Sequence, residues 1–187
     1  LFTFEIILEV GSDVVIESLN DLVEALEEGE FSQVESQIKD LVLTEDKLEP
    51  YLFWEKGSYT RNCIAHNNEF ELLLLCWEPG QKTAVHCHNG QECWIKVVNG
   101  EFEEVMYTLD DNDFPKLQLK QTFSETQITS MKNPELFHSL ENISSERAIT
   151  LHLYHKPITE CRYVNVKTGE MQLAEMDYYS VNGRLND

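Results

Sequence analysis

From residue 59 onward the chain is a succession of short segments rich in β-branched and aromatic residues, separated by turn residues. Eight segments stand out: YTRNCIAH, FELLLLCW, TAVHCH, CWIKVV, EFEEVMYTL, TQITSM, AITLHLYH and CRYVNV. HNNE, NGE and KTGE provide the residues of hairpin turns between them. Strands at this spacing, with no helical pattern between them, predict a mainly antiparallel β-sandwich or β-barrel.

The first fifty or so residues have a different pattern, which is helical. SLNDLVEALEEG places Ser18 and Asp21 as a capping box and Gly29 as a stop signal. SQVESQIKDLV repeats the device with Ser32 and Glu35. Its apolar residues recur at helical spacing: Val34, Ile38, Leu41 and Val42. DKLEPYLFW predicts a short third helical turn.

The two patterns fit one domain over residues 1–187. Helices are expected over about 15–55 and the β-barrel over about 57–180. A chain of 187 residues can bury a core without disulfides or structural metals, whereas the helical part alone is too small to do so. We therefore expect an N-terminal helical layer against the barrel.

Charge and hydropathy exclude several partners. The net charge of −20 would repel the phosphate backbone of nucleic acids. Residues 15–50 carry eleven acidic residues against two lysines, a pattern typical of a solvated helix face. No apolar run reaches the length of a membrane span, and LFTFEIILEV lacks the basic flank of a secretory signal.

The cysteines indicate a reducing compartment. There are five, an odd number, with no C-x-x-C pair: Cys63, Cys76, Cys87, Cys93 and Cys161. Free thiols are the rule in the cytoplasm, so a cytoplasmic protein is expected. The expected oligomeric state is a monomer.

The stretch GQKTAVHCHNG places two of the six histidines one residue apart, at His86 and His88. On a β-strand, side chains at i and i+2 project from one face, so both imidazoles can reach the same point. Cys87 between them then points the other way and is expected to pack in the core. The pair predicts a metal site on a strand.

With its flanks this stretch resembles the first motif of the cupin superfamily, small β-barrels that hold a metal among histidines. Gly80 precedes His86 and His88, and Gly100 follows them. The second cupin motif resembles HSLEN, with His138 and Asn142. The resemblance implies a cupin-type, jelly-roll-like barrel in which His138 is the third metal ligand.

Ordinary cupins add a glutamate ligand, and here Cys93 stands at its expected distance from Gly100. Strand alternation turns Cys93, Ile95 and Val97 inward and leaves Trp94 and Lys96 outside. Glu92 lies next to Cys93 and would compete as a ligand if the strand slipped by one residue.

From Tyr59 to Cys161 the chain resembles the cysteine dioxygenase family more narrowly. The matching segments come in the family's order: YTRN with Arg61, the pair Cys76–Trp77, VHCH, Cys93, FHSLEN, TLHLY and Cys161. The resemblance implies a non-haem Fe(II) enzyme that oxidises L-cysteine with O2 to cysteine sulfinic acid. Its iron would be bound by His86, His88 and His138.

The same resemblance assigns roles around the iron. Arg61, with Tyr59, would bind the substrate carboxylate through the planar fork of its guanidinium. On the strand TLHLY, Tyr154 would donate its hydroxyl to oxygen or substrate and His152 would orient it. Thr150 would stand behind His152. Cys93 and Tyr154 match the positions that form a thioether cross-link in the eukaryotic-type relatives.

Three other functions stay open at this point. A thiol dioxygenase of the 3-mercaptopropionate type would use the same iron, although such relatives tend to carry glutamine at the position of Arg61. A non-catalytic cupin that binds a metal or ligand is the second, because a fold alone does not fix function. The third is a hydrolytic Zn(II) site with Glu92 as general base.

Overall fold

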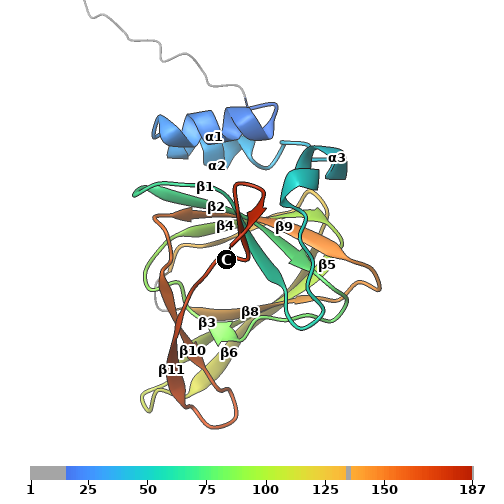
Figure 1. Ribbon diagram of the computed structural model, residues 1–187. Coiled ribbons are helices and arrows are strands. Elements are labelled where there is room, and N and C mark those ends of the chain that lie inside the picture. The colour runs from blue at the N-terminus through green and yellow to red at the C-terminus, as the bar shows by residue number, and fades with distance from the viewer. Residues whose placement is uncertain (1–15, 134–135, 187) are drawn as a thin grey trace, which may run out of the picture.

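A computed structural model describes residues 16–133 and 136–186 of the chain, so the assessment of LFTFEIILEV lies outside the described residues. Two β-sheets face each other, and the helices cover the outer side of one of them (Figure 1). The predicted fold class is confirmed: the protein is mainly β, with the jelly-roll arrangement of cupins. Its strands form two separate sheets rather than one closed barrel. In the described ranges no helix is long and apolar enough to cross a membrane.

The seven-stranded sheet runs in the order β13 (Arg184–Leu185), β12 (Ser180–Val181), β1 (Thr60–His66), β2 (Phe70–Trp77), β9 (Ala148–His155), β4 (Cys93–Asn99) and β7 (Ile128–Met131). The six-stranded sheet runs in the order β11 (Met171–Glu175), β10 (Glu160–Val164), β3 (Val85–His86), β8 (Phe137–Asn142), β5 (Glu101–Leu109) and β6 (Pro115–Ser124). Neighbouring strands are antiparallel except β1 and β12, which are parallel.

All eight predicted segments contain strands, and β2, β5 and β9 occupy their full predicted ranges. Within TAVHCH only Val85 and His86 form a strand. The pattern gave no signal for β6, whose sequence PKLQLKQTFS is mostly exposed. It lies at the edge of its sheet, where polar side chains are tolerated on both faces.

One predicted hairpin is wrong. HNNE joins β1 to β2 and KTGE joins β10 to β11, both antiparallel pairs, but NGE joins β4 to β5, which lie in different sheets. The chain crosses there at Gly100, which has a φ of 90°. A Cβ at Gly100 would lie 2.5 Å from the Cβ of Ala148, so the crossing needs glycine.

The helices are α1 (Leu19–Glu27), α2 (Phe31–Gln37), α3 (Glu45–Leu48) and the 3-10 helix η1 (Glu49–Tyr51). The ends predicted for the first helix are confirmed. At its start, Ser18 Oγ accepts a hydrogen bond from the backbone N–H of Asp21, and after its end Gly29 has a φ of 84°. The second capping box is wrong. α2 begins at Phe31 with Glu30 as N-cap, so Ser32 lies inside the helix.

The helical layer closes the outer face of the seven-stranded sheet. Leu22, Val34 and Ile38 are fully buried and share one hydrophobic cluster with Leu72 of β2 and Trp94 of β4. Leu41 is also buried, whereas Val42, which the helical spacing had grouped with them, is 70% exposed. The helix ends before it, so the spacing no longer applies.

Trp94 and Lys96 point away from the core between the sheets, as predicted, but they are buried. The helices cover this outer face of the seven-stranded sheet. The Nζ of Lys96 donates to the carbonyl of Lys39 at 2.6 Å. Burial lowers the pKa of Lys96, while Asp40 opposes that shift. The inward residues Cys93, Ile95 and Val97 lie, as predicted, in the core between the two sheets.

We propose that helical layer and sheets form a single cooperative domain, since they share one core. Leu22→Ala should then lower the free energy of unfolding by about 3 kcal/mol and leave one cooperative transition. Val42→Ala, at an exposed position, should change it by less than about 0.5 kcal/mol. Urea titration followed by circular dichroism and tryptophan fluorescence measures both. Two separate transitions would contradict the proposal.

Candidate metal centre

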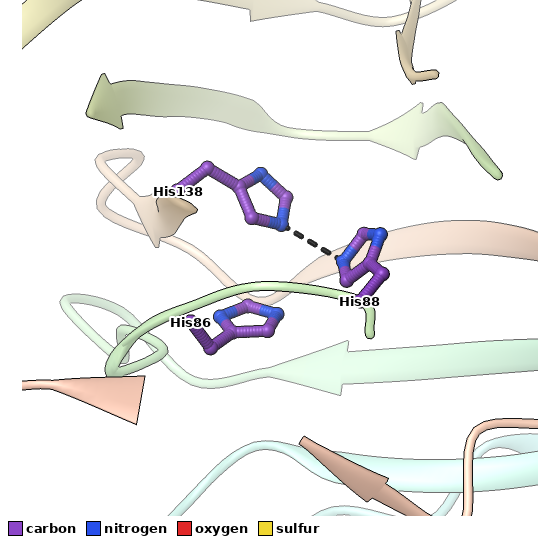
Figure 2. Close-up of side chains that lie close together, drawn as sticks. All are labelled: His86, His88 and His138. Carbon is purple, nitrogen blue, oxygen red and sulfur yellow. Dashed lines mark hydrogen bonds between the residues drawn. The ribbon is translucent and has the colours of Figure 1, made fainter. Parts of the chain in front are cut away.

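Three imidazoles meet between the sheets (Figure 2). His86 ends β3 and lies directly opposite His138 of β8. His88 follows two residues later, beyond the end of the strand. The two rings do come together as predicted, but not because both residues lie on one strand. One ligand atom from each ring lies within 4.8 Å of the others, and His138 Nε2 is 3.0 Å from His88 Nε2.

Two of the rings are fixed by their Nδ1 atoms. His138 Nδ1 donates to the carboxylate of Glu104 at 2.8 Å, and His86 Nδ1 donates to the carbonyl of Ala84 at 2.9 Å. A histidine that donates through Nδ1 can offer its Nε2 as a metal ligand. His138 Nε2 and His88 Nε2 are in hydrogen-bond contact with each other. The Nδ1 of His88 has no hydrogen-bond partner, so His88 can move its proton there and offer Nε2 as well.

Glu104 lies at an inward position of β5 and is fully buried. Gln121 Nε2 and Thr129 Oγ1 donate to its second oxygen at 2.8 and 3.0 Å. Burial raises the pKa of Glu104, but the hydrogen bonds from His138, Gln121 and Thr129 outweigh it, so the net pKa is lowered. The result is a carboxylate that orients a ligand ring, as such outer partners do at metal sites.

Burial, reinforced by the neighbouring histidines, lowers the pKa of His86 to about 3 and that of His88 well below its usual range. Both rings are therefore neutral at neutral pH, the form that binds metals. Three imidazoles whose nitrogens meet at one point fit a divalent transition metal such as iron or zinc. Among the described residues the metal-binding group comprises only these histidines, and it does not include Glu92.

A chain of hydrogen bonds leads along β9 toward this centre. Trp77 Nε1 donates to Thr150 Oγ1 at 2.9 Å, and Thr150 lies 2.9 Å from His152 Nε2. Because Trp77 can only donate, the hydroxyl proton of Thr150 is free for His152 Nε2. That leaves the proton of His152 on Nδ1, 3.5 Å from the hydroxyl of Tyr154.

The ring of Tyr154 lies against that of His88, with centroids 5.2 Å apart. Burial first, and then Cys93, raises the pKa of Tyr154, so its hydroxyl stays protonated. Burial lowers the pKa of His152, which is neutral. Cys93 on β4 is paired with Tyr154 on β9, and both are buried. The register predicted for Cys93 is thus the one found.

A cavity opens on the histidines. Its wall includes Tyr59, Arg61, His86, His138, His152 and Tyr154. Tyr59 stacks on Trp77 with ring centroids 4.4 Å apart. Arg61 is only 8% exposed, and its Nη1 donates to the carbonyl of Asp177 at 2.9 Å. A guanidinium carries five N–H donors, so donors remain for a ligand in the cavity.

Some residues singled out from the sequence lie away from this wall. Cys87 packs in a small apolar cluster, as expected. The side-chain amide of Asn142 donates to the carbonyls of Glu78 and Glu146, which holds the turn after β8. Cys161 contacts Met176, which does line the cavity.

The sequence reasoning missed four residues around the site: Glu71, Trp77 as a donor, Glu104 and Tyr178. Glu71 and Glu104 had a readable signal, because each is an acid at an inward position of a predicted strand. Tyr178 had none, because it approaches the site only through the folding of the C-terminal segment.

Comparison with known proteins identifies a family that this chain matches. A model of the family described as cysteine dioxygenase type I matches residues 16–166. Cysteine dioxygenase type 1 of Danio rerio is 29% identical over 135 residues, which cover 70% of this chain and 67% of that protein. The Homo sapiens protein of the same name is 29% identical, with 71% and 68% covered.

Among solved structures, a conserved protein from Klebsiella pneumoniae with a double-stranded β-helix domain has a TM-score of 0.49 and 17% identity. The match covers 68% of this chain and 87% of that one.

Replacing Glu104 tests the carboxylate behind His138. Glu104→Gln keeps the shape but removes the charge that holds the Nδ1 proton, so affinity for a divalent metal should fall about 10- to 100-fold. Competition with a chromophoric chelator measures it. Glu103→Gln is the matched control, since Glu103 forms a surface ion pair with Lys120 at 2.7 Å. Equal affinities in all three proteins would contradict the role of Glu104.

Proposed function

The chain belongs to the cysteine dioxygenase type I family, and we propose that its resident metal is Fe(II), held by His86, His88 and His138. It is a cupin dioxygenase that oxidises the thiol of cysteine with O2 to the sulfinic acid. The observation that carries the choice of site is the convergence of three histidine rings beside a cavity that His86, His138 and Arg61 line.

When bound, Fe(II) supplies the acidification of the substrate thiol and the activation of O2. The three neutral ligands leave the ion its full charge. The protein's own contribution is to hold this centre in a water-poor interior, since His138 and Tyr154 are almost fully buried.

Arg61 binds the carboxylate of the substrate in this proposal. Its guanidinium is already positioned by the carbonyl of Asp177 and by the ring of Tyr178, which lies 5.5 Å from it. A positioned guanidinium loses little freedom when it binds a carboxylate through two N–H groups. Tyr59 borders the same end of the cavity.

Tyr154 acts as a proton donor at the reacting end. Its raised pKa keeps the hydroxyl protonated. Because His152 Nδ1–H faces the hydroxyl oxygen, that oxygen accepts there and its own proton is left for oxygen or substrate. Thr150 fixes the tautomer of His152. Trp77 in turn fixes the hydroxyl of Thr150.

The alternatives are not favoured. Family membership argues against a purely metal-binding cupin. Arg61 in the cavity wall argues against the mercaptopropionate type, because such relatives tend to carry glutamine at this position. A hydrolytic zinc site would need Glu92, which lies outside the histidine group.

We also propose that the enzyme works as a monomer in the cytoplasm and binds neither nucleic acid nor membranes. All five cysteines are free and buried, in keeping with a reducing compartment. The net charge of −20 supports the absence of nucleic acid.

Oxygen consumption tests the function. Protein loaded anaerobically with Fe(II) should consume one O2 per cysteine sulfinate formed from L-cysteine, and more slowly with 3-mercaptopropionate. Zn(II)-loaded protein should be inactive. Arg61→Ala should raise KM for cysteine about 10- to 100-fold, because charge-assisted hydrogen bonds are lost, with unchanged iron content. Absence of sulfinate with full iron occupancy would refute the activity, and an unchanged KM in Arg61→Ala would refute the role of that residue.

A thioether between Cys93 and Tyr154 is the second proposal for this site. The two residues are direct neighbours across β4 and β9. Bond formation between Sγ and a ring carbon removes the S–H and C–H hydrogens, and O2 would take up these two electrons and two protons as hydrogen peroxide. The iron that His86, His88 and His138 would hold would supply the redox chemistry. Intact mass after turnover should therefore fall by two hydrogen atoms, with no change in Cys93→Ser. An unaltered mass of the native chain after many turnovers would argue against the bond.

A further inference from the structure

Glu71 is a charged residue in an apolar row. On β2 the side chains of Glu71, Leu73 and Leu75 alternate inward, and Glu71 is fully buried. Its strand neighbour on β9 is Tyr154. An isolated buried carboxylate is costly, so this residue needs compensating partners.

The partners of Glu71 lead to the substrate end of the cavity. The hydroxyl of Tyr178 donates to its Oε1 at 2.6 Å. Burial first, and then this contact, raises the pKa of Tyr178, so the hydroxyl stays protonated. The only cation paired with Glu71 among the described residues is Arg61, whose Nη2 lies 3.5 Å from both carboxylate oxygens.

The contact between Arg61 and Glu71 is long for a hydrogen bond, so it acts through charge more than through geometry. The guanidinium is held in place by Asp177 and the ring of Tyr178 instead. Removal of the charge on Glu71 would therefore leave Arg61 in position but change the electrostatic potential at its N–H groups.

We propose that Glu71 is a counter-charge that weakens the hold of Arg61 on carboxylates and so promotes release of the product. The inference rests on the proposed function, in which Arg61 binds the substrate carboxylate. A substrate carboxylate and Glu71 share one guanidinium and repel each other in a poorly screened interior. The sulfinate product keeps the carboxylate of cysteine, so the same repulsion weakens its binding.

A purely structural role for Glu71 makes the opposite prediction. Glutamine has the same shape and still accepts from Tyr178, so a residue that only filled space and accepted hydrogen bonds would leave substrate affinity unchanged or reduced after substitution. A counter-charge, once removed, gives tighter binding of carboxylates and no change for a thiol that lacks one.

The experiment compares Glu71→Gln with the wild-type Fe(II) enzyme. Anaerobic calorimetry should show a Kd for L-cysteine about tenfold lower in the variant, and the inhibition constant of cysteine sulfinate should fall to a similar extent. The Kd of cysteamine, which has no carboxylate, should stay the same. Glu78→Gln is the matched control, since it removes the acid of an exposed pair with Arg147.

An unchanged or higher Kd for cysteine in Glu71→Gln would overturn the proposal, as would an equal fall for cysteamine. Wild-type protein that binds no cysteine would instead overturn the proposed function, and the inference with it.

If Glu71→Gln does not fold, Tyr178→Phe serves in its place. It removes the hydroxyl donated to Glu71 and keeps both charges, so the carboxylate relies more on Arg61 and the Kd for cysteine should rise about threefold or more. An unchanged or lower Kd in this variant would also count against the counter-charge.

Discussion

The pairing of β3 with β8 is the contact on which the rest of the site depends. It sets His86 directly opposite His138, and the chain leaving β3 then brings His88 to the same point. These strands are some fifty residues apart in sequence, so their alignment comes from the sheet and not from any local signal. The face of the sheet opposite the site packs against apolar residues such as Cys87, which keeps the register from slipping.

Buried charges around the histidines occur with partners. Glu104 accepts from His138, and Glu71 accepts from Tyr178 and lies near Arg61. An unpaired charge in a low-dielectric interior costs much free energy, so each buried acid is accompanied by groups that donate hydrogen bonds to it. Both acids occupy inward strand positions that would otherwise be apolar. Their place in the fold is thus explained by the site and not by the stability of the core.

The two faces of the seven-stranded sheet have different roles: one packs in the apolar core and the other contributes residues to the site. Toward the helices it presents an apolar surface that includes Leu72 and Trp94. Toward the six-stranded sheet it presents Arg61, His152 and Tyr154. The alternation of side chains along a strand makes this division possible, and it is why one segment such as AITLHLYH can serve both core and site.

Local patterns in the sequence determined the strands β2, β5 and β9, the ends of α1, the inward face of Cys93 and the family resemblance that named the three histidines. The resemblance rests on several short segments in order from Tyr59 to Cys161. The other features depend on neighbours within a few residues, where side-chain periodicity and capping are read directly. The crossing at Gly100, the burial of Lys96 and the neighbours of Arg61 and His138 were decided by the tertiary structure. They depend on which strands and segments come together across the chain, and no spacing within one segment contains that information.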